Sequence, residues 1–248
     1  MTDRNGRRAF LTIAGAGAVL AACRKDSTGA REPAASATAS ATDTPALQDD
    51  KGDDVSATED LMREHGVIRR VLVVYREAAV RLRTKPASLV PQALQQAAKL
   101  MQTFAEDYHE RQLEEAHIFP ALMKPDSSLA GTVKTLIAQH QRGREITEYV
   151  LAAMQRTIGD RTAEPLARTL EAFALMYEEH AAVEDTIVFP AWKRVLSPKA
   201  LDDMGDLFED IEHQTFGKDG FADAVDRVGE LEKMLGIDLA SLTAPSPR

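Results

Sequence analysis

The sequence has almost no cysteine, and its charge is mainly of one sign. Of its 248 residues only Cys23 is a cysteine, which excludes an internal disulfide, an iron–sulfur cluster and a zinc site built from thiolates. The net charge is −9. The first 23 residues contribute +2, from three arginines and one aspartate, so the rest of the chain carries about −11. This charge argues against binding to nucleic acid or to an anionic membrane surface.

The first 23 residues (1–23) are expected to be an export signal. Arg7 and Arg8 form a twin-arginine pattern, followed by the apolar run Phe10 to Ala22. This run is too short to cross a bilayer as a stable helix. Leu20 to Cys23 resemble a lipoprotein signal box, so Cys23 is expected to carry a lipid and to anchor the exported protein in the cell envelope. The alternative is a plain cleavable signal with an incidental cysteine.

Residues 24–57 are predicted to be a disordered linker. They are rich in alanine, serine, threonine and aspartate, and Leu47 and Val55 are their only large aliphatic residues. Such a segment cannot bury enough apolar surface to order itself. About 190 residues remain after it, enough for one globular domain with a core. We divide them into a helical bundle (58–195) and a C-terminal helical extension (196–248).

The folded part shows helical periodicity and no alternation of the kind found in strands. It is predicted to be all-α, an up-down four-helix bundle with two additional C-terminal helices. Ser56 and Ser197 are predicted helix caps, and Gly217 is predicted to end the fifth helix. Pro120 and Pro190 should kink the second and fourth helices. The long helices are expected near 56–85, 91–123, 128–158 and 163–195, and the last helix near 221–235.

Each long helix carries one histidine on its apolar stripe: His65, His109, His140 and His180. A single such histidine is usually a core residue with its own hydrogen-bond partner. Four of them in one layer of a bundle would leave polar groups unsatisfied unless they share a partner, and a metal ion is such a partner.

Two carboxylates complete the predicted site. Glu184 lies four residues after His180 and shares its face, although a buried ion pair with an arginine is an alternative. Glu114 lies five residues after His109, about 140° further round a regular helix, and a π-bulge would turn it inward. Glu110 and Glu115 compete with Glu114, which is favoured because it aligns with Glu184 when the two Phe-Pro-Ala segments, 119–121 and 189–191, are superposed.

Two further histidines are assigned outside the site. His117 is expected behind the ligands or exposed, and His213 on the surface.

Nitrogen and carboxylate ligands without sulfur suit iron, manganese or zinc. Two bridging carboxylates favour a pair of metal ions about 3.5 Å apart, with open positions for a small ligand.

With these residues the chain resembles the hemerythrin-like (HHE cation-binding) proteins over about Thr58 to Val195. The resemblance rests on residues 60–65, on the two segments that end in Phe-Pro-Ala, and on Gln139-His140. It implies a four-helix bundle around a non-haem, oxo-bridged centre of two iron ions, in preference to manganese or zinc. It also implies the histidine ligands His65, His109, His140 and His180 and the bridging carboxylates Glu114 and Glu184.

The chain departs from the dioxygen carriers of that family at one position. Those proteins have five histidine ligands, two of them one turn apart on the third helix, but here Arg144 stands four residues after His140. The departure argues against simple reversible carriage of dioxygen.

We therefore expect a di-iron binding protein of the cell envelope that binds or senses dioxygen, nitric oxide or peroxide, rather than a dedicated enzyme. One alternative is a peroxidase-like or oxidase-like enzyme that uses Tyr75, Tyr108 or Tyr177 as relays or hydrogen-bond donors. The simpler interpretation of these tyrosines is core aromatics with a polar tip. The other alternative is a metal-free helical interaction lipoprotein.

Overall fold

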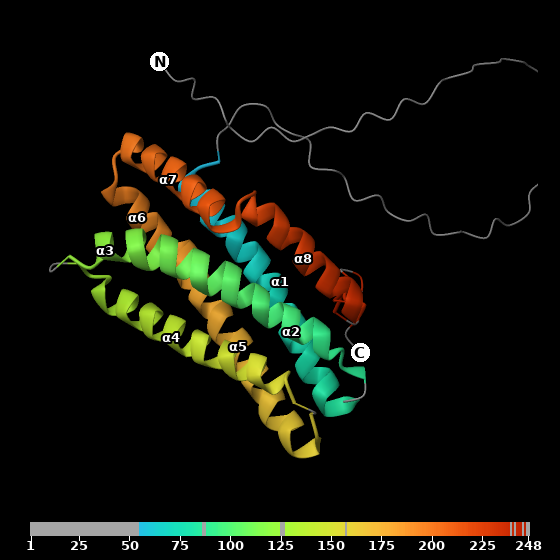
Figure 1. Ribbon diagram of the computed structural model, residues 1–248. Helices are drawn as coiled ribbons and strands as arrows, with labels where there is room; N and C mark the ends of the chain where they lie inside the picture. Colours follow the sequence, from blue (N-terminus) through green and yellow to red (C-terminus); the bar gives the residue numbers. More distant parts are fainter. Residues whose placement is uncertain are drawn as a thin grey trace, which may run out of the picture. The chain divides into compact units, whose positions relative to one another are not determined.

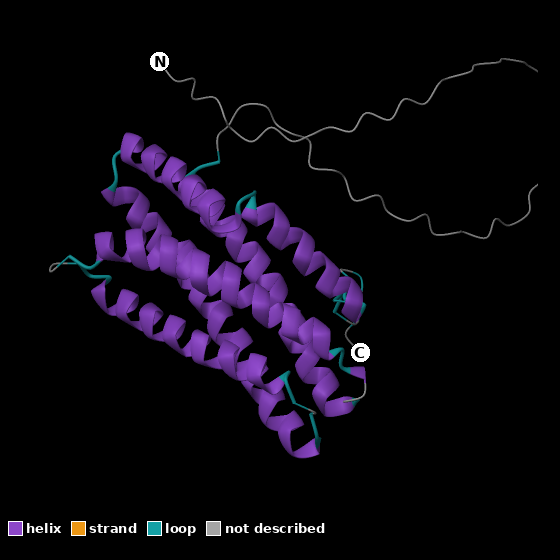
Figure 2. Cartoon of the chain, in the orientation of Figure 1, coloured by secondary structure: helices purple, strands orange, loops and turns teal. Residues whose placement is uncertain are grey.

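The structure, a computed structural model, describes residues 55–246 apart from 86–87, 125–126, 157, 239, 241 and 245. Within these residues every regular element is a helix and there is no strand (Figure 2). None of the described helices combines the length and the apolar composition that crossing a membrane requires. The predicted export signal, with Cys23, and all of the predicted linker before Val55 lie outside the described residues.

Four long helical rods form an up-down bundle in which each rod runs opposite to the one before it (Figure 1). Around the bundle, the first rod lies beside the second and the fourth, and the third rod closes the ring. In chain order the rods are α1 (Ala57–Thr84); α2 (Pro91–Leu100), η2 (Met101–Ile118) and α3 (Phe119–Leu122); α4 (Ala130–Ala153); and α5 (Asp160–Val183), η3 (Glu184–Val188) and α6 (Phe189–Val195).

The predicted all-α bundle with two further helices is confirmed, and so are two of its caps. The Ser56 side chain accepts a hydrogen bond from the Glu59 backbone N–H at 3.3 Å, and Ser197 accepts one from Ala200 at 3.2 Å. Gly217 ends the fifth helix with φ 67°, a conformation that glycine adopts without steric cost.

The third and fourth rods differ from the prediction at the loop that joins them. The third rod ends at Ala153 rather than near 158, and the fourth begins at Asp160 rather than near 163. The early start of the fourth rod is explained at Gly159, whose backbone N–H donates to the Thr162 hydroxyl at 3.0 Å. That hydroxyl in turn donates to the Gly159 carbonyl at 2.9 Å and so fixes an early start of the helix.

The second and fourth rods contain π-helix, η2 over 18 residues and η3 over five. In a π-helix the backbone N–H bonds to the carbonyl five residues earlier, so a turn holds more residues than in an α-helix. Pro120 and Pro190 each stand second in the short α-helix that follows, where the hydrogen-bond pattern returns from π to α. The two Phe-Pro-Ala segments therefore mark the ends of the two π-helices.

The C-terminal extension consists of α7 (Pro198–Phe216) and α8 (Gly220–Leu235), which pack along α1 and the second rod (Figure 1). The Phe216 ring lies 5.2 Å from the Tyr108 ring between centroids. Phe208 stacks on Trp192 at 5.8 Å. The extension thus covers the outer face of the bundle beside the histidine layer.

Candidate metal centre

The four predicted histidines meet in one layer, as two pairs. The Nε2 atoms of His65, on α1, and His109, on η2, lie 3.0 Å apart. The Nε2 atoms of His140, on α4, and His180, on α5, also lie 3.0 Å apart. All four side chains are buried. Four ring nitrogens from four different helices therefore point into one small space.

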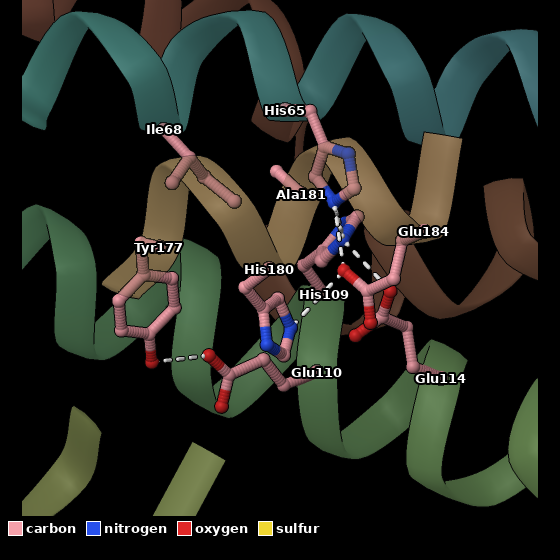
Figure 3. Close-up of a pocket in the computed structure, with 9 residues that line it drawn as sticks. All are labelled: His65, Ile68, His109, Glu110, Glu114, Tyr177, His180, Ala181 and Glu184. Atoms are coloured by element: carbon pink, nitrogen blue, oxygen red, sulfur yellow. Dashed lines mark hydrogen bonds and ion pairs between the residues drawn. The ribbon is translucent and has the colours of Figure 1, made fainter. Parts of the chain in front are cut away.

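Glu114 and Glu184 span the gap between the two histidine pairs. Glu114 places Oε1 3.3 Å from His109 Nε2 and Oε2 3.3 Å from His140 Nε2. Glu184 Oε2 lies 3.0 Å from His180 Nε2 and 3.5 Å from His65 Nε2. Figure 3 shows both carboxylates beside His65, His109 and His180. The η2 helix turns Glu114 inward despite its five-residue spacing from His109, as the predicted π-bulge required.

The outer nitrogen of each histidine is held by an oxygen. His65 Nδ1 lies 2.7 Å from Asp185, His109 Nδ1 lies 2.6 Å from Glu64, and His140 Nδ1 lies 2.8 Å from Glu115. His180 Nδ1 lies 2.9 Å from the side-chain oxygen of Gln139. A carboxylate on Nδ1 fixes the proton there and leaves Nε2 to bind a metal, an arrangement common around metal-bound histidines.

The carboxylate oxygens and the Nε2 atoms that face the centre of the site lack favourable hydrogen-bond partners in the protein. Both oxygens of Glu114 and of Glu184 are buried without a hydrogen-bond partner, although buried polar atoms are nearly always partnered. His65 and His109 both donate their Nδ1 protons to carboxylates, so when the two rings are in the same protonation state their facing Nε2 atoms carry two lone pairs or two protons. Two like groups 3.0 Å apart repel each other. A cation between them removes the repulsion and gives the carboxylates a partner, so these residues fit a metal.

The pKa shifts of His109 and Glu114 show which groups of the metal-free site carry protons. Burial lowers the pKa of His109, but the negative charge of Glu114 and the hydrogen bond to Glu64 outweigh it, and the pKa lies well above its usual value. Burial raises the pKa of Glu114, yet His109 and His140 bring it well below its usual range. Protonated imidazoles beside ionised carboxylates are the state from which a metal ion displaces protons.

The charge around the histidines suits two divalent ions. Six carboxylates lie within hydrogen-bond or ion-pair distance of the four rings. Two arginines, Arg69 and Arg144, are bonded to these carboxylates. With these carboxylates and arginines ionised and the four histidines neutral, as they are when they bind a metal, the formal charge is −4. A buried charge of this size needs compensation, and two divalent cations supply +4. The six carboxylates are Glu64, Glu110, Glu114, Glu115, Glu184 and Asp185.

The comparison with known proteins also indicates a cation-binding domain. The family model of the hemerythrin HHE cation binding domain matches residues 56–192, more than half of the chain. The chain belongs to this family. Uncharacterized proteins of Mycobacterium tuberculosis (Rv1995) and Mycobacterium bovis (Mb2018) are 46% identical to it over 192 residues, which is 76% of this chain and 74% of theirs. No solved structure matches.

Within this HHE domain, Glu114 rather than its two competitors faces both histidine pairs. Glu115 turns to the outer side of His140, where it also binds Arg144 at 2.5 Å. Glu110 accepts hydrogen bonds from the Tyr177 hydroxyl at 2.7 Å and from Arg144 at 3.0 Å. Glu110, Glu115 and His140 are close enough to form a third cation-binding group, but the Arg144 guanidinium already supplies the positive charge there.

The alternative of a buried ion pair between Glu184 and an arginine is not what the HHE domain contains. The ion pairs of Glu184 among the described residues are with His65 and His180. His213 is exposed, as predicted, and its Nδ1 bonds to the Glu209 carbonyl at 2.9 Å. His117 is half-buried, and its ring lies 5.8 Å from the Phe208 ring, between centroids.

The partners of the outer nitrogens were not assigned from the sequence. A signal for all four was present, because Glu64, Glu115, Gln139 and Asp185 each stand directly beside a predicted site residue in the chain. Two tyrosines belong to the same network. Tyr108 donates to Glu64 at 2.9 Å, and Tyr177 donates to Glu110. Burial, and then the charge of Glu110, raises the pKa of Tyr177 well above its usual value, so its hydroxyl keeps its proton.

Proposed function

We propose that this protein holds two metal ions, iron in preference to manganese or zinc, between its four long helices. The observation that carries the proposal is the pair of facing Nε2 contacts, both 3.0 Å, next to two buried carboxylates that have no hydrogen-bond partner. His65 and His109 would hold one ion, and His140 and His180 the other. Glu114 and Glu184 would be shared between the two ions.

We further propose that the centre binds or senses a small ligand: dioxygen, nitric oxide or peroxide. Four imidazoles and two shared carboxylates do not fill the coordination positions of two iron ions, and bound iron would supply ligand binding and redox chemistry. A cavity of ≈ 10 Å³ lies against His65, His109 and His180 (Figure 3). This is about the smallest volume that holds one water molecule, so the space beside the proposed ions admits only a very small ligand.

The second candidate is an enzyme of the peroxidase or oxidase type. The observation that favours it is the hydrogen bond between the Tyr177 hydroxyl and the Glu110 carboxyl beside the same cavity, because a buried carboxyl can exchange a proton with a bound ligand. Turnover of hydrogen peroxide with a reductant by the iron-loaded protein would support the enzyme. Binding without turnover would support the ligand-binding protein.

The protein is proposed to act in the cell envelope, exported by the twin-arginine route and anchored through a lipid on Cys23. The support is the sequence pattern of residues 1–23. Replacing Arg7 and Arg8 together by lysine should stop export, and Cys23→Ser should release the protein from the membrane fraction. Unchanged location of both variants in cell fractionation would contradict this proposal without affecting the metal site.

Metal content and the visible spectrum test the central proposal. Residues 24–248 made with iron should contain about two iron ions per chain and show charge-transfer absorption that changes with azide and air. A chain without metal, or with one zinc ion and no visible absorption, would overturn it.

A double variant separates the metal site from a metal-free scaffold. His180→Leu with Glu184→Met should lose iron and lower the melting temperature of the loaded protein, because bound metal stabilises the fold. A scaffold without metal predicts unchanged or higher stability, since the change removes two buried polar groups.

A further inference from the structure

The outer partner of His180 differs in charge from the partners of the other three histidines. Each of those three places its Nδ1 atom 2.6–2.8 Å from a carboxylate oxygen. His180 Nδ1 instead lies 2.9 Å from Oε1 of Gln139, the oxygen of an amide. One of the four proposed histidine ligands is therefore held by a neutral group and three by acids.

The charge of the outer partner changes how well a histidine binds a metal. A carboxylate on Nδ1 attracts the proton there and makes the Nε2 atom of the same ring more basic. An amide oxygen accepts the same hydrogen bond without the negative charge, and hydrogen bonds between neutral groups are about half as strong as those with an ionised partner. Because the His180 ring is buried, solvent screens this difference little. Nε2 of His180 is thus a weaker metal ligand.

The difference separates the two histidine pairs. Each pair has one outer carboxylate that is also bonded to an arginine, on His65 in the first pair and on His140 in the second. These two partners balance each other. The remaining partner is the carboxylate of Glu64 in the first pair and the amide of Gln139 in the second.

A further carboxylate near the second pair does not replace the missing one. Oε2 of Glu110 lies 3.9 Å from His140 Nδ1, which is beyond hydrogen-bond distance. The two oxygens of Glu110 accept instead from the Tyr177 hydroxyl and from Arg144, so the guanidinium already compensates this charge. Gln139 remains the group that receives the Nδ1 proton of His180.

We propose that Gln139 makes the two metal positions unequal, so that the ion between His140 and His180 is held more weakly than the ion between His65 and His109. The inference rests on the proposed centre of two metal ions and names the ion that exchanges more readily. At iron concentrations between the two dissociation constants the chain keeps one ion and releases the other. Gln139 acts through His180 and is a positioning residue, not a ligand.

Anaerobic titration of the metal-free chain with iron(II), in competition with a chelator of known affinity, measures both binding steps. Gln139→Glu gives His180 the carboxylate partner that it lacks, and water solvates the added charge because the side chain is partly exposed. The weaker step should become about tenfold tighter, the lower end of what such a partner contributes. The tighter step should change less than about threefold. A gain in affinity at one step is not expected from a purely structural role of Gln139.

Two more variants make the test specific. Gln141→Glu is the matched control, because Gln141 is exposed on the same helix and undergoes the same change of charge. Both of its iron affinities should stay as in the wild type. Asp185→Asn replaces the carboxylate on His65 by an amide and should weaken the tighter step about tenfold, which assigns that step to the first histidine pair.

The outcomes separate this inference from the proposed function. Two bound iron ions whose affinities do not change in Gln139→Glu would overturn the inference and leave the metal centre standing. An equal gain in Gln141→Glu would also overturn it, since the effect would then come from overall charge. A wild-type chain that holds no iron would overturn both the inference and the proposed function.

Discussion

Nδ1 of His65 lies 2.7 Å from Asp185 Oδ1, and the other carboxylate oxygen of Asp185 is paired with Arg69. Asp185 thus orients the imidazole of His65, and the partly exposed side chain of Arg69 in turn holds Asp185 in place. Removing a partner of this kind typically weakens metal binding about 10–100-fold. Asp185→Ala should therefore weaken iron binding by about 10–100-fold, measured by competition with a chelator of known affinity.

The surface residue Asp203 provides the control for this change. It is exposed and paired with exposed Lys199, so Asp203→Ala should leave iron binding unchanged. Equal affinities of the wild type and Asp185→Ala would show that His65 needs no orientation by Asp185, or that His65 does not bind the metal.

Arg144 is the countercharge of two carboxylates beside His140. Its guanidinium contacts Glu115 at 2.5 Å and Glu110 at 3.0 Å, and Glu110 is almost fully buried. Arg144→Met leaves the Glu110 charge without this partner. The free energy of unfolding, measured with urea, should fall by about 2–3 kcal/mol, somewhat less than a fully buried pair would lose.

An exposed ion pair gives the comparison for Arg144. Arg76 and Glu178 are paired at 2.6 Å; Arg76 is exposed and Glu178 is partly exposed. Arg76→Met should cost less than about 1 kcal/mol, because solvent screens such pairs. Equal losses in the two variants would mean that burial adds nothing to the Arg144 interaction.

The sequence alone predicts which residues face the centre of the site. His65, His140 and His180 lie on apolar stripes whose period fixes the buried face, and the repeated Phe-Pro-Ala segments aligned Glu114 with Glu184. The 18-residue length of η2 was not predictable, because the choice between α and π hydrogen bonding depends on the packing of both faces.

The outer residues were harder to predict for a different reason. Glu110, Glu114 and Glu115 are close in the sequence, yet they face Tyr177, the histidine layer and Arg144 respectively. Each role depends on which side chain a neighbouring helix presents. The sequence shows Arg144 only as the replacement of a histidine, because its contact with Glu110 and Glu115 depends on the relative placement of η2 and α4.

Glu106 is a buried acid outside the proposed ligand set. It is 3% exposed, and its Oε1 has no hydrogen-bond partner. Burial, with a contribution from the charge of Glu110, raises the pKa of Glu106 to about 7, although Thr147 and Arg144 on α4 act in the opposite direction. Asp107 on η2 and Tyr75 on α1 also interact with its charge. The folded chain therefore keeps a proton that the unfolded chain releases near pH 4.5.

This difference gives a pH dependence with a definite sign. Between about pH 4.5 and 7 the native state binds more protons than the unfolded state, so the contribution of Glu106 to stability falls as the pH rises and is lost above about 7. The full loss is about 3 kcal/mol. Glu106→Gln cannot ionise, so its stability relative to the wild type should increase by about that amount from pH 4.5 to pH 8.

Urea unfolding of both proteins across this pH range measures the difference, in which the other titrating groups cancel. Glu148→Gln, at an exposed position on α4, controls for the loss of one surface charge and should give a nearly constant difference. A constant difference for Glu106→Gln as well would mean that the pKa of Glu106 is not raised in the folded protein. Its environment would then have to contain water or a cation that stabilises the charge, since desolvation of a buried carboxylate otherwise favours the neutral form.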